Sequence, residues 1–246
     1  MKKYCYVTLA TNQTYLLGAK FLANFLKKTK TKYPIVLLTI ENLKNEDLTD
    51  FDEVVYVPYL KFNNSNICPD SFNKLYIFNL LNYDKCLYLD ADLIVFKNLD
   101  FLLENFSNYE FLTIRTYKPS YSPKEDLPNN FLFMCTPSAE TFQKIQNNLF
   151  KLLTYRHDED VVKEFLYPKY FKENKFDKIV NTYENLLNID FIKNNKYFYH
   201  YAGTYKYFMF LSDINPKIFT LLPIDTIRNF LFNFCRPYEN LCYLNK

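Results

Sequence analysis

The sequence predicts an α/β fold with a mainly parallel sheet. Short apolar runs typical of buried strands alternate with segments that repeat apolar residues at helical spacing. This alternation favours parallel strands joined by helices. The 246 residues suit one substantial domain, or one domain with an appendage, and are enough to bury a large core.

The first half of the chain gives the clearest alternation. The expected elements are a strand at residues 4–9, a capping turn at 11–14, a helix at 15–28, strands at 34–40 and 53–57, a helix at 72–81 capped by Ser71, and a strand ending at Asp90. The helix at 15–28 carries one apolar face, formed by Leu16, Ala19, Leu22, Ala23 and Leu26. Pro58 ends the strand before it because proline cannot donate to a ladder.

The second half repeats the pattern less regularly. A strand at 111–115, a polar loop at 118–130, a strand at 131–135 and a helix starting at Thr136 and Pro137 are expected in that order. After about residue 207 the alternation fades. Residues 225–234 form an amphipathic pattern, and we expect this helix to pack on the domain or mediate a homodimer; membrane contact is the minor alternative.

Composition restricts the partners and the compartment. The formal charge is only +3, and the basic stretch at 26–32 suits a helix end, so no nucleic-acid partner is expected. Cys5, Cys86 and Cys135 lie in apolar runs, as buried thiols do in a reducing compartment. Neither a signal peptide nor a membrane-spanning stretch is recognisable, so we expect a cytoplasmic location.

Two carboxylates follow the apolar run of residues 86–89. Asp90 and Asp92, separated by Ala91, would repel each other unless a cation lay between them, and hard metals prefer such oxygen ligands. The alternative is a turn cap after a strand. The same spacing recurs at 50–52, which we interpret as a solvated turn, and at 158–160.

Only two glycines occur, Gly18 and Gly203. A chain that avoids glycine so strongly should keep it where close approach or backbone geometry demands it. No glycine-rich phosphate loop can be built from two glycines. Gly203 is flanked by His200 and Lys206, a metal ligand candidate and a cation.

Together these segments resemble glycosyltransferase family 8, in its glycogenin-like form, with matches in order over most of residues 4–208. The matching motifs are the segment at 6–18, Asn73-Lys74-Leu75, Asp90-Ala91-Asp92, Asn129-Asn130 with the segment at 136–142, and His200-x-x-Gly203-x-x-Lys206. The resemblance implies a GT-A type, Rossmann-like domain over residues 1–208. Residues 209–246 would be a C-terminal helical extension packed on it.

The resemblance also implies a metal-dependent, retaining hexosyltransferase that uses a UDP-sugar donor. The metal, manganese (Mn2+) or alternatively magnesium (Mg2+), would be held by Asp90, Asp92 and His200. The donor would contact Leu9, Thr11, Asn12, Tyr15, Lys74, Asp90, Ala91, Asp92, Asn129, Asn130, Gly203 and Lys206. The acceptor would be a separate saccharide or protein, with self-glycosylation as the minority view.

Asp160 is the catalytic candidate. The family's D-G-G-D-Q loop aligns with residues 157–161, which places Asp160 near the reacting sugar and Val161 where the family has Gln. Phe131 and the pair Tyr207-Phe208 also depart from the family pattern, and the donor-contacting Arg has no clear counterpart. These departures indicate altered sugar recognition beside an intact metal and diphosphate site.

Two other functions remain open from the sequence. An apolar strand followed by D-x-D also occurs in haloacid dehalogenase-type phosphatases, although there it usually lies near the N-terminus. A catalytically impaired nucleotide-sugar-binding scaffold would account for Val161 and the missing Arg. The two alternatives differ from the transferase in what they release: inorganic phosphate from a phosphatase, and nothing from a scaffold.

Overall fold

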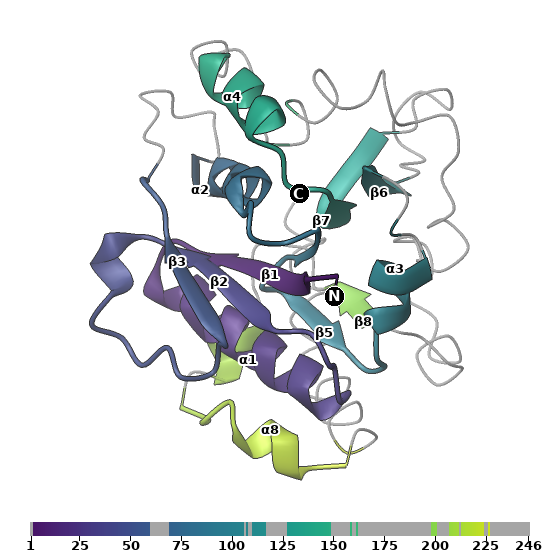
Figure 1. Ribbon diagram of the computed structural model, residues 1–246. Coiled ribbons are helices and arrows are strands. Elements are labelled where there is room, and N and C mark those ends of the chain that lie inside the picture. The colour runs from purple at the N-terminus through teal and green to yellow at the C-terminus, as the bar shows by residue number, and fades with distance from the viewer. Residues whose placement is uncertain are drawn as a thin grey trace.

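A computed structural model describes residues 2–59, 69–105, 107, 110–116, 127–148, 158, 161, 198–200, 207–211, 213–223 and 226. Its centre is a six-stranded sheet with the order β3-β2-β1-β4-β7-β6 (Figure 1). The strands are β1 (Tyr4–Ala10), β2 (Ile35–Thr39), β3 (Glu53–Tyr56), β4 (Lys85–Leu89), β6 (Phe111–Thr116) and β7 (Leu127–Cys135). The first four are parallel, whereas β7 and β6 are antiparallel to their neighbours. The predicted α/β fold with a mainly parallel sheet is confirmed.

Helix α1 (Gln13–Lys28) forms as the sequence predicts. Asn12 caps it, because its side chain accepts a hydrogen bond from the Tyr15 amide at 3.0 Å. All five residues of the predicted apolar face are buried. Lys27 and Lys28 lie in the last turn, where cations suit the helix dipole. The helix therefore covers one face of the sheet with its apolar side, and the spacing of apolar residues in the sequence is enough to predict that side.

The next helical segment differs from the prediction. It consists of α2 (Pro69–Phe72) followed by a 3₁₀ helix, η2 (Asn73–Asn79), so it starts three residues early and Ser71 lies inside it. Proline fits the first turn of a helix because its missing N–H would have no partner there. Asn73 to Phe78 are all buried, because this segment packs against β1 and β2 of the sheet. Both the continuous helix at 72–81 and its Ser71 cap were wrong.

Two more boundaries are corrected on the antiparallel side. Strand β7 begins at Leu127, so Asn129 and Asn130 lie inside a strand rather than in the loop predicted for 118–130. Helix α4 (Ala139–Asn147) is capped by Ser138, not begun at Thr136. Thr136 instead extends the sheet edge, since its amide donates to the Glu110 carbonyl at 2.7 Å.

Several short elements were not predicted at all. Strands β5 (Leu93–Val95) and β8 (Phe198–His200) pair in a separate two-stranded sheet, and α3 (Asp100–Asn105) follows β5. Three-residue strands are too short to show a period of two. The predicted solvated turn at 50–52 is also wrong in part, because Asp50 is buried and accepts a hydrogen bond from Asn24 at 2.8 Å.

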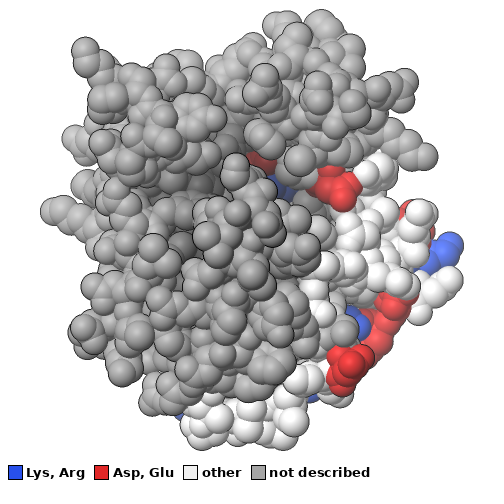
Figure 2. Space-filling model, turned by 180° about the vertical axis from the view of Figure 1, so that it is seen from behind, with Lys and Arg blue, Asp and Glu red and all other residues white. Residues whose placement is uncertain are grey.

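The core lies on both faces of the sheet. One apolar cluster packs α1, α3 and β5 against it, and the other packs η2 and α4. Cys5, Cys86 and Cys135 are buried as free thiols in the second cluster, as the sequence predicts. On the face shown in Figure 2, several of the described basic side chains lie beside acidic ones. Among the described residues, Lys44 with Glu41 and Lys217 with Asp47 form exposed ion pairs.

Chain segments after residue 207 pack on α1. These are the 3₁₀ helix η6 (Tyr207–Leu211) and α8 (Ile218–Leu221), and the Lys28 ammonium donates to the Thr220 carbonyl at 3.0 Å. The predicted boundary between the main domain and its C-terminal extension, at residues 208 and 209, falls inside η6. The predicted helix at 225–234 lies outside the described residues, apart from Thr226. In the part of the chain that is described, no helix has the length and apolar character needed to cross a membrane.

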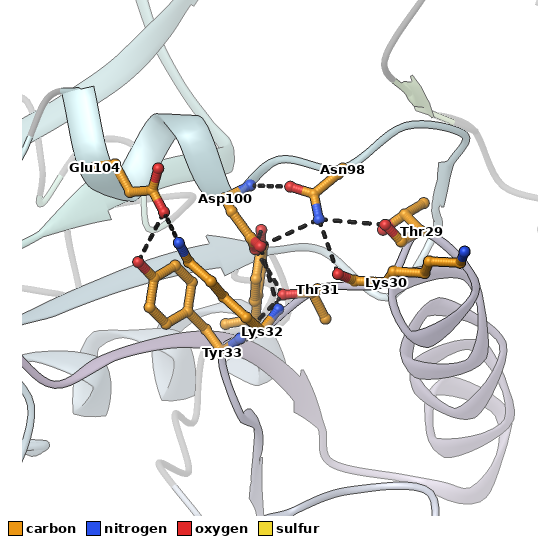
Figure 3. Close-up of polar contacts among 9 residues, drawn as sticks. Thr29, Lys30, Thr31, Lys32, Tyr33, Asn98, Asp100 and Glu104 are labelled. Atoms are coloured by element: carbon orange, nitrogen blue, oxygen red, sulfur yellow. Dashed lines mark hydrogen bonds and ion pairs between the residues drawn. The ribbon is translucent and has the colours of Figure 1, made fainter.

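A buried carboxylate joins three of these elements (Figure 3). Asp100, at the start of α3, accepts hydrogen bonds from the Tyr6 hydroxyl at 2.8 Å, the Thr31 hydroxyl at 2.6 Å and the Lys32 amide at 3.1 Å. Asn98 adds a fourth at 3.1 Å and also donates to carbonyls at the end of α1. Burial alone would raise the pKa of Asp100, but these donors hold it below its usual value.

Replacing Asp100 by Asn should therefore destabilise the fold by about 2–3 kcal/mol at pH 7, because the donors lose a charged acceptor. The contribution is present above the unfolded pKa near 3.8 and is lost as pH falls through the lowered folded pKa. Urea unfolding at pH 7 and at pH 3 measures both effects. The difference in free energy of unfolding between wild type and variant should be smaller at pH 3 than at pH 7. Glu41→Gln, an exposed carboxylate, is the control. A gap of equal size at both pH values would contradict the charge-based explanation.

Candidate active site

The candidate site lies where the sheet order reverses. β1 and β4 are neighbours, β2 and β3 continue on one side, and β7 and β6 on the other. Ligands of open α/β sheets bind beyond the carboxyl ends of strands at such a point. Thr11 and Asn12 follow the end of β1, and Asp90 follows the end of β4. The predicted nucleoside and metal residues thus meet at one edge.

The D-A-D segment forms a tight turn between β4 and β5. The Asp90 amide donates to the Phe131 carbonyl on β7 at 2.8 Å, and the Leu93 amide donates back to the Asp90 carbonyl at 3.0 Å. Ala91 and Asp92 are buried, whereas about a quarter of the Asp90 side chain is exposed, 27%. The turn therefore presents one carboxylate towards solvent and buries the other.

Lys74 is the charged centre of the site. Its ammonium lies 3.1 Å from an Asp90 oxygen and 3.3 Å from an Asp158 oxygen, and it sits 5.1 Å from the centre of the Tyr88 ring. Burial would lower the pKa of Lys74, but the two carboxylates outweigh burial and raise it. The lysine therefore remains a cation although it is buried.

Asn130 completes this cluster from β7. Its amide nitrogen donates to Asp158 at 3.1 Å, and its amide oxygen, fully buried, accepts no hydrogen bond from any described residue. A buried acceptor without a donor is costly, so an atom in this position suits a ligand hydroxyl or amide. Asn129, the neighbouring prediction, pairs with Ile114, next to the register shift between β6 and β7.

Asp158 is a site candidate that sequence reasoning missed. The segment at 158–160 gave Asp160 as the candidate, yet Asp158 is the one that the structure describes, buried against Lys74 and Asn130. Asp160 lies outside the described residues. The only sequence signal for Asp158 was its place in a third D-x-D spacing, which does not distinguish its two acids.

The predicted nucleoside residues gather at the start of α1. Leu9 and Thr11 are buried, and Asn12 combines its capping bond with a weaker bond from its amide nitrogen to Asp70 at 3.4 Å. Tyr15 is partly exposed and packs edge-on against Phe208 of η6. Four of the predicted donor contacts therefore lie on one short stretch that runs from the end of β1 into α1.

The last predicted group can be placed only in part. Strand pairing sets the backbone of His200 opposite Leu93, directly after Asp92. Gly203 and Lys206 lie outside the described residues. Carboxylates with an imidazole suit a divalent cation such as manganese, which stays the predicted metal. Within the described residues, no group of three or more His, Cys, Asp or Glu is arranged to hold one.

Gly18 explains how α1 comes so close to this turn. A Cβ at Gly18 would overlap the Phe208 ring and lie 2.9 Å from the Ala91 carbonyl oxygen. Only glycine therefore lets the helix rest on the D-A-D turn while Phe208 packs beside it. The expectation that a kept glycine marks a close approach is confirmed at this position.

Comparisons with known proteins find similarity to glycosyltransferases. The chain is 29% identical to mouse (Mus musculus) glycogenin-1 over 160 residues, which cover 59% of the chain and 45% of glycogenin-1. It is 33% identical to galactinol synthase 10 of Arabidopsis thaliana over 126 residues, which cover 44% of the chain and 36% of the relative. The resemblance to glycosyltransferase family 8 is therefore confirmed, at modest identity.

Solved structures show the fold. An active-site mutant of LgtC superposes with a TM-score of 0.55 at 13% identity, covering 82% of this chain and 89% of the other. The glycogenin-like chain thus has the GT-A glycosyltransferase fold. It spans less than half the length of glycogenin-1 and of the galactinol synthase that it matches. No family model matches it.

Gly18→Ala should destabilise the protein by about 1–3 kcal/mol, because overpacking against Phe208 and the Ala91 carbonyl outweighs the better helix propensity of alanine. Adding Phe208→Leu should recover only part of the loss, since the carbonyl contact remains. Thermal and urea unfolding of both single variants and the double variant measure this. A Gly18→Ala protein more stable than wild type would show that helix propensity dominates and that Phe208 and the Ala91 carbonyl move to accommodate the new methyl group.

Proposed function

We propose that this chain transfers a hexose from a UDP-sugar to a separate saccharide or protein acceptor, with retention of configuration and with a divalent metal, manganese before magnesium. The observation that carries the proposal is the buried Lys74 ammonium between Asp90 and Asp158 at the switch point of the sheet. The similarity to glycosyltransferases supports the same activity. The phosphatase alternative is not favoured by these relatives.

At the diphosphate end of the site, the negative charge of the leaving group must be stabilised. A cation held by Asp90, Asp92 and His200 would supply stabilisation of the negative charge that the leaving diphosphate gains. Lys74 would hold Asp90 in a fixed orientation through its 3.1 Å bond. Lys206 would add a second cationic donor from the segment after Gly203.

The sugar end is formed by Asp158 and Asn130. Asp158 is fixed by Lys74 and by the Asn130 amide, so its carboxylate can accept from a sugar hydroxyl or face a carbon that becomes positive. The buried Asn130 oxygen offers a second acceptor. We therefore assign Asp158 to the reacting sugar beside the earlier candidate Asp160, and a comparison of the two variants separates them.

The remaining features stay predictions. They are the cytoplasmic location, the homodimer, and the extension at 209–246 as a part packed on the same domain. The scaffold alternative differs from the enzyme in one measurable respect, because it would bind UDP yet release none from a UDP-sugar. Incubation with UDP-glucose, UDP-galactose and UDP-N-acetylglucosamine in manganese tests release directly.

UDP affinity should fall at least tenfold on chelation, because the diphosphate then meets the two carboxylates without a cation between them. Asp92→Ala in manganese should weaken binding to the same extent. Isothermal titration with UDP, in manganese and in EDTA, measures both effects. Asp84→Asn, an exposed carboxylate at the opposite edge of the sheet, is the matched control. Unchanged affinity in EDTA would exclude a metal-held diphosphate.

Asp158→Asn should lower turnover about a hundredfold while UDP affinity changes less than about threefold, as expected for an interaction made mainly in the transition state. Asp160→Asn is measured beside it. Sugar-transfer or donor-hydrolysis rates, UDP titration and a thermal melt of each variant form the experiment. If Asp160→Asn alone loses turnover, the carboxylate at the reacting sugar is Asp160, and Asp158 only positions Lys74.

A further inference from the structure

One helical segment carries charged residues to both halves of the site. Asp70 lies in α2 and Lys74 four residues later in η2. At 1.5–2.0 Å of rise per residue, the two are roughly 6–8 Å apart along the segment. Lys74 reaches Asp90 and Asp158, on the diphosphate and sugar side. Asp70 lies at the other end, which the proposed function does not use.

Two side chains hold the Asp70 carboxylate in place. The Tyr59 hydroxyl donates to one oxygen, and the Asn12 amide nitrogen donates to the other at 3.4 Å. The hydrogen bond to Asp70, with burial, raises the pKa of Tyr59 to about 12, so the phenol remains a donor. The carboxylate is thus oriented by two donors and serves as an acceptor towards both.

The position of Asp70 follows from these two contacts. Tyr59 follows the end of β3 and Asn12 follows the end of β1, so the carboxylate lies over the carboxyl edge of the parallel strands. Its bond to Asn12 places it beside the stretch that carries Leu9, Thr11 and Tyr15. It is half-buried, and each oxygen keeps a lone pair beyond the bond described here.

We propose that Asp70 reads the nucleoside of the donor: its carboxylate accepts a hydrogen bond from an N–H of the base or an O–H of the ribose. This rests on the proposed function, and it adds a specificity-determining residue to that site. An acceptor-only group selects for a ligand that presents a donor at that position. The imide N–H of uracil and the ribose hydroxyls are the donors that UDP offers, whereas cytosine presents a bare ring nitrogen at the imide position.

The experiment compares UDP with 3-methyl-UDP, 2′-deoxy-UDP and 3′-deoxy-UDP by titration in manganese. Asp70→Asn should weaken UDP binding about tenfold, because a charged acceptor is lost. One analogue should bind the wild-type protein about tenfold more weakly than UDP does. The affinity of that analogue should not fall further in the Asp70→Asn variant. Loss with the 3-methyl analogue identifies the base, and loss with a deoxy analogue identifies the ribose.

Two further variants keep the test decisive if Asp70→Asn folds poorly. Tyr59→Phe keeps the carboxylate but frees it, so UDP should bind about threefold more weakly while the same analogue remains disfavoured. Asp84→Asn should leave every affinity unchanged. An equal loss for UDP and all analogues on Asp70→Asn would overturn the proposal, since Asp70 would then only position Asn12.

The two proposals fail in different ways. Wild-type protein that binds none of the nucleotides overturns the proposed function and this inference together. Wild-type protein that binds UDP, with Asp70→Asn binding it equally well, overturns only the role of Asp70.

Discussion

The burial of the Lys74 charge is the constraint on which the site depends. An ammonium removed from water is tolerated only when carboxylates and polar groups surround it, and here they come from three separate parts of the chain. Asp90 follows β4, Asp158 comes from a distant segment, and the Asn130 carbonyl lies on β7. Because Lys74 contacts all three groups, the ion cluster also ties β4, η2 and β7 together.

The same cluster explains why the site could be predicted only in part. Residues that adjoin regular elements were found, because patterning locates strand ends and helix caps: Asp90 and Asp92 after β4, and Asn12 before α1. Lys74 and Asn130 were found through the family motifs. Asp158 was not, since its role depends on which of two nearby acids turns towards a lysine far away in the sequence. That choice is made by tertiary packing, for which the sequence carries no local signal.

The fold shows the same division. The four parallel strands and α1 follow from apolar runs long enough to show their period. Three other features could not be predicted, because contacts between segments determine them. They are the 3₁₀ winding of η2, the early start of β7 and the pairing of β5 with β8. Asn73 illustrates this, since its side chain donates to the Pro58 carbonyl at 2.9 Å and ties the start of η2 to the end of β3.

The reversed direction of β7 has a consequence for how such a site can change. In a parallel strand, the residues that reach the ligand edge are the last ones, and they lead into a helix that packs on the core. Asn129 and Asn130 instead lie in the first half of an antiparallel strand, so the chain passes the candidate site before it enters the core. Insertions ahead of β7 can therefore reshape this side of the candidate site while Leu132 to Cys135 keep their register with β4. The sheet thus divides the site into a side fixed by its parallel strands and a side open to variation.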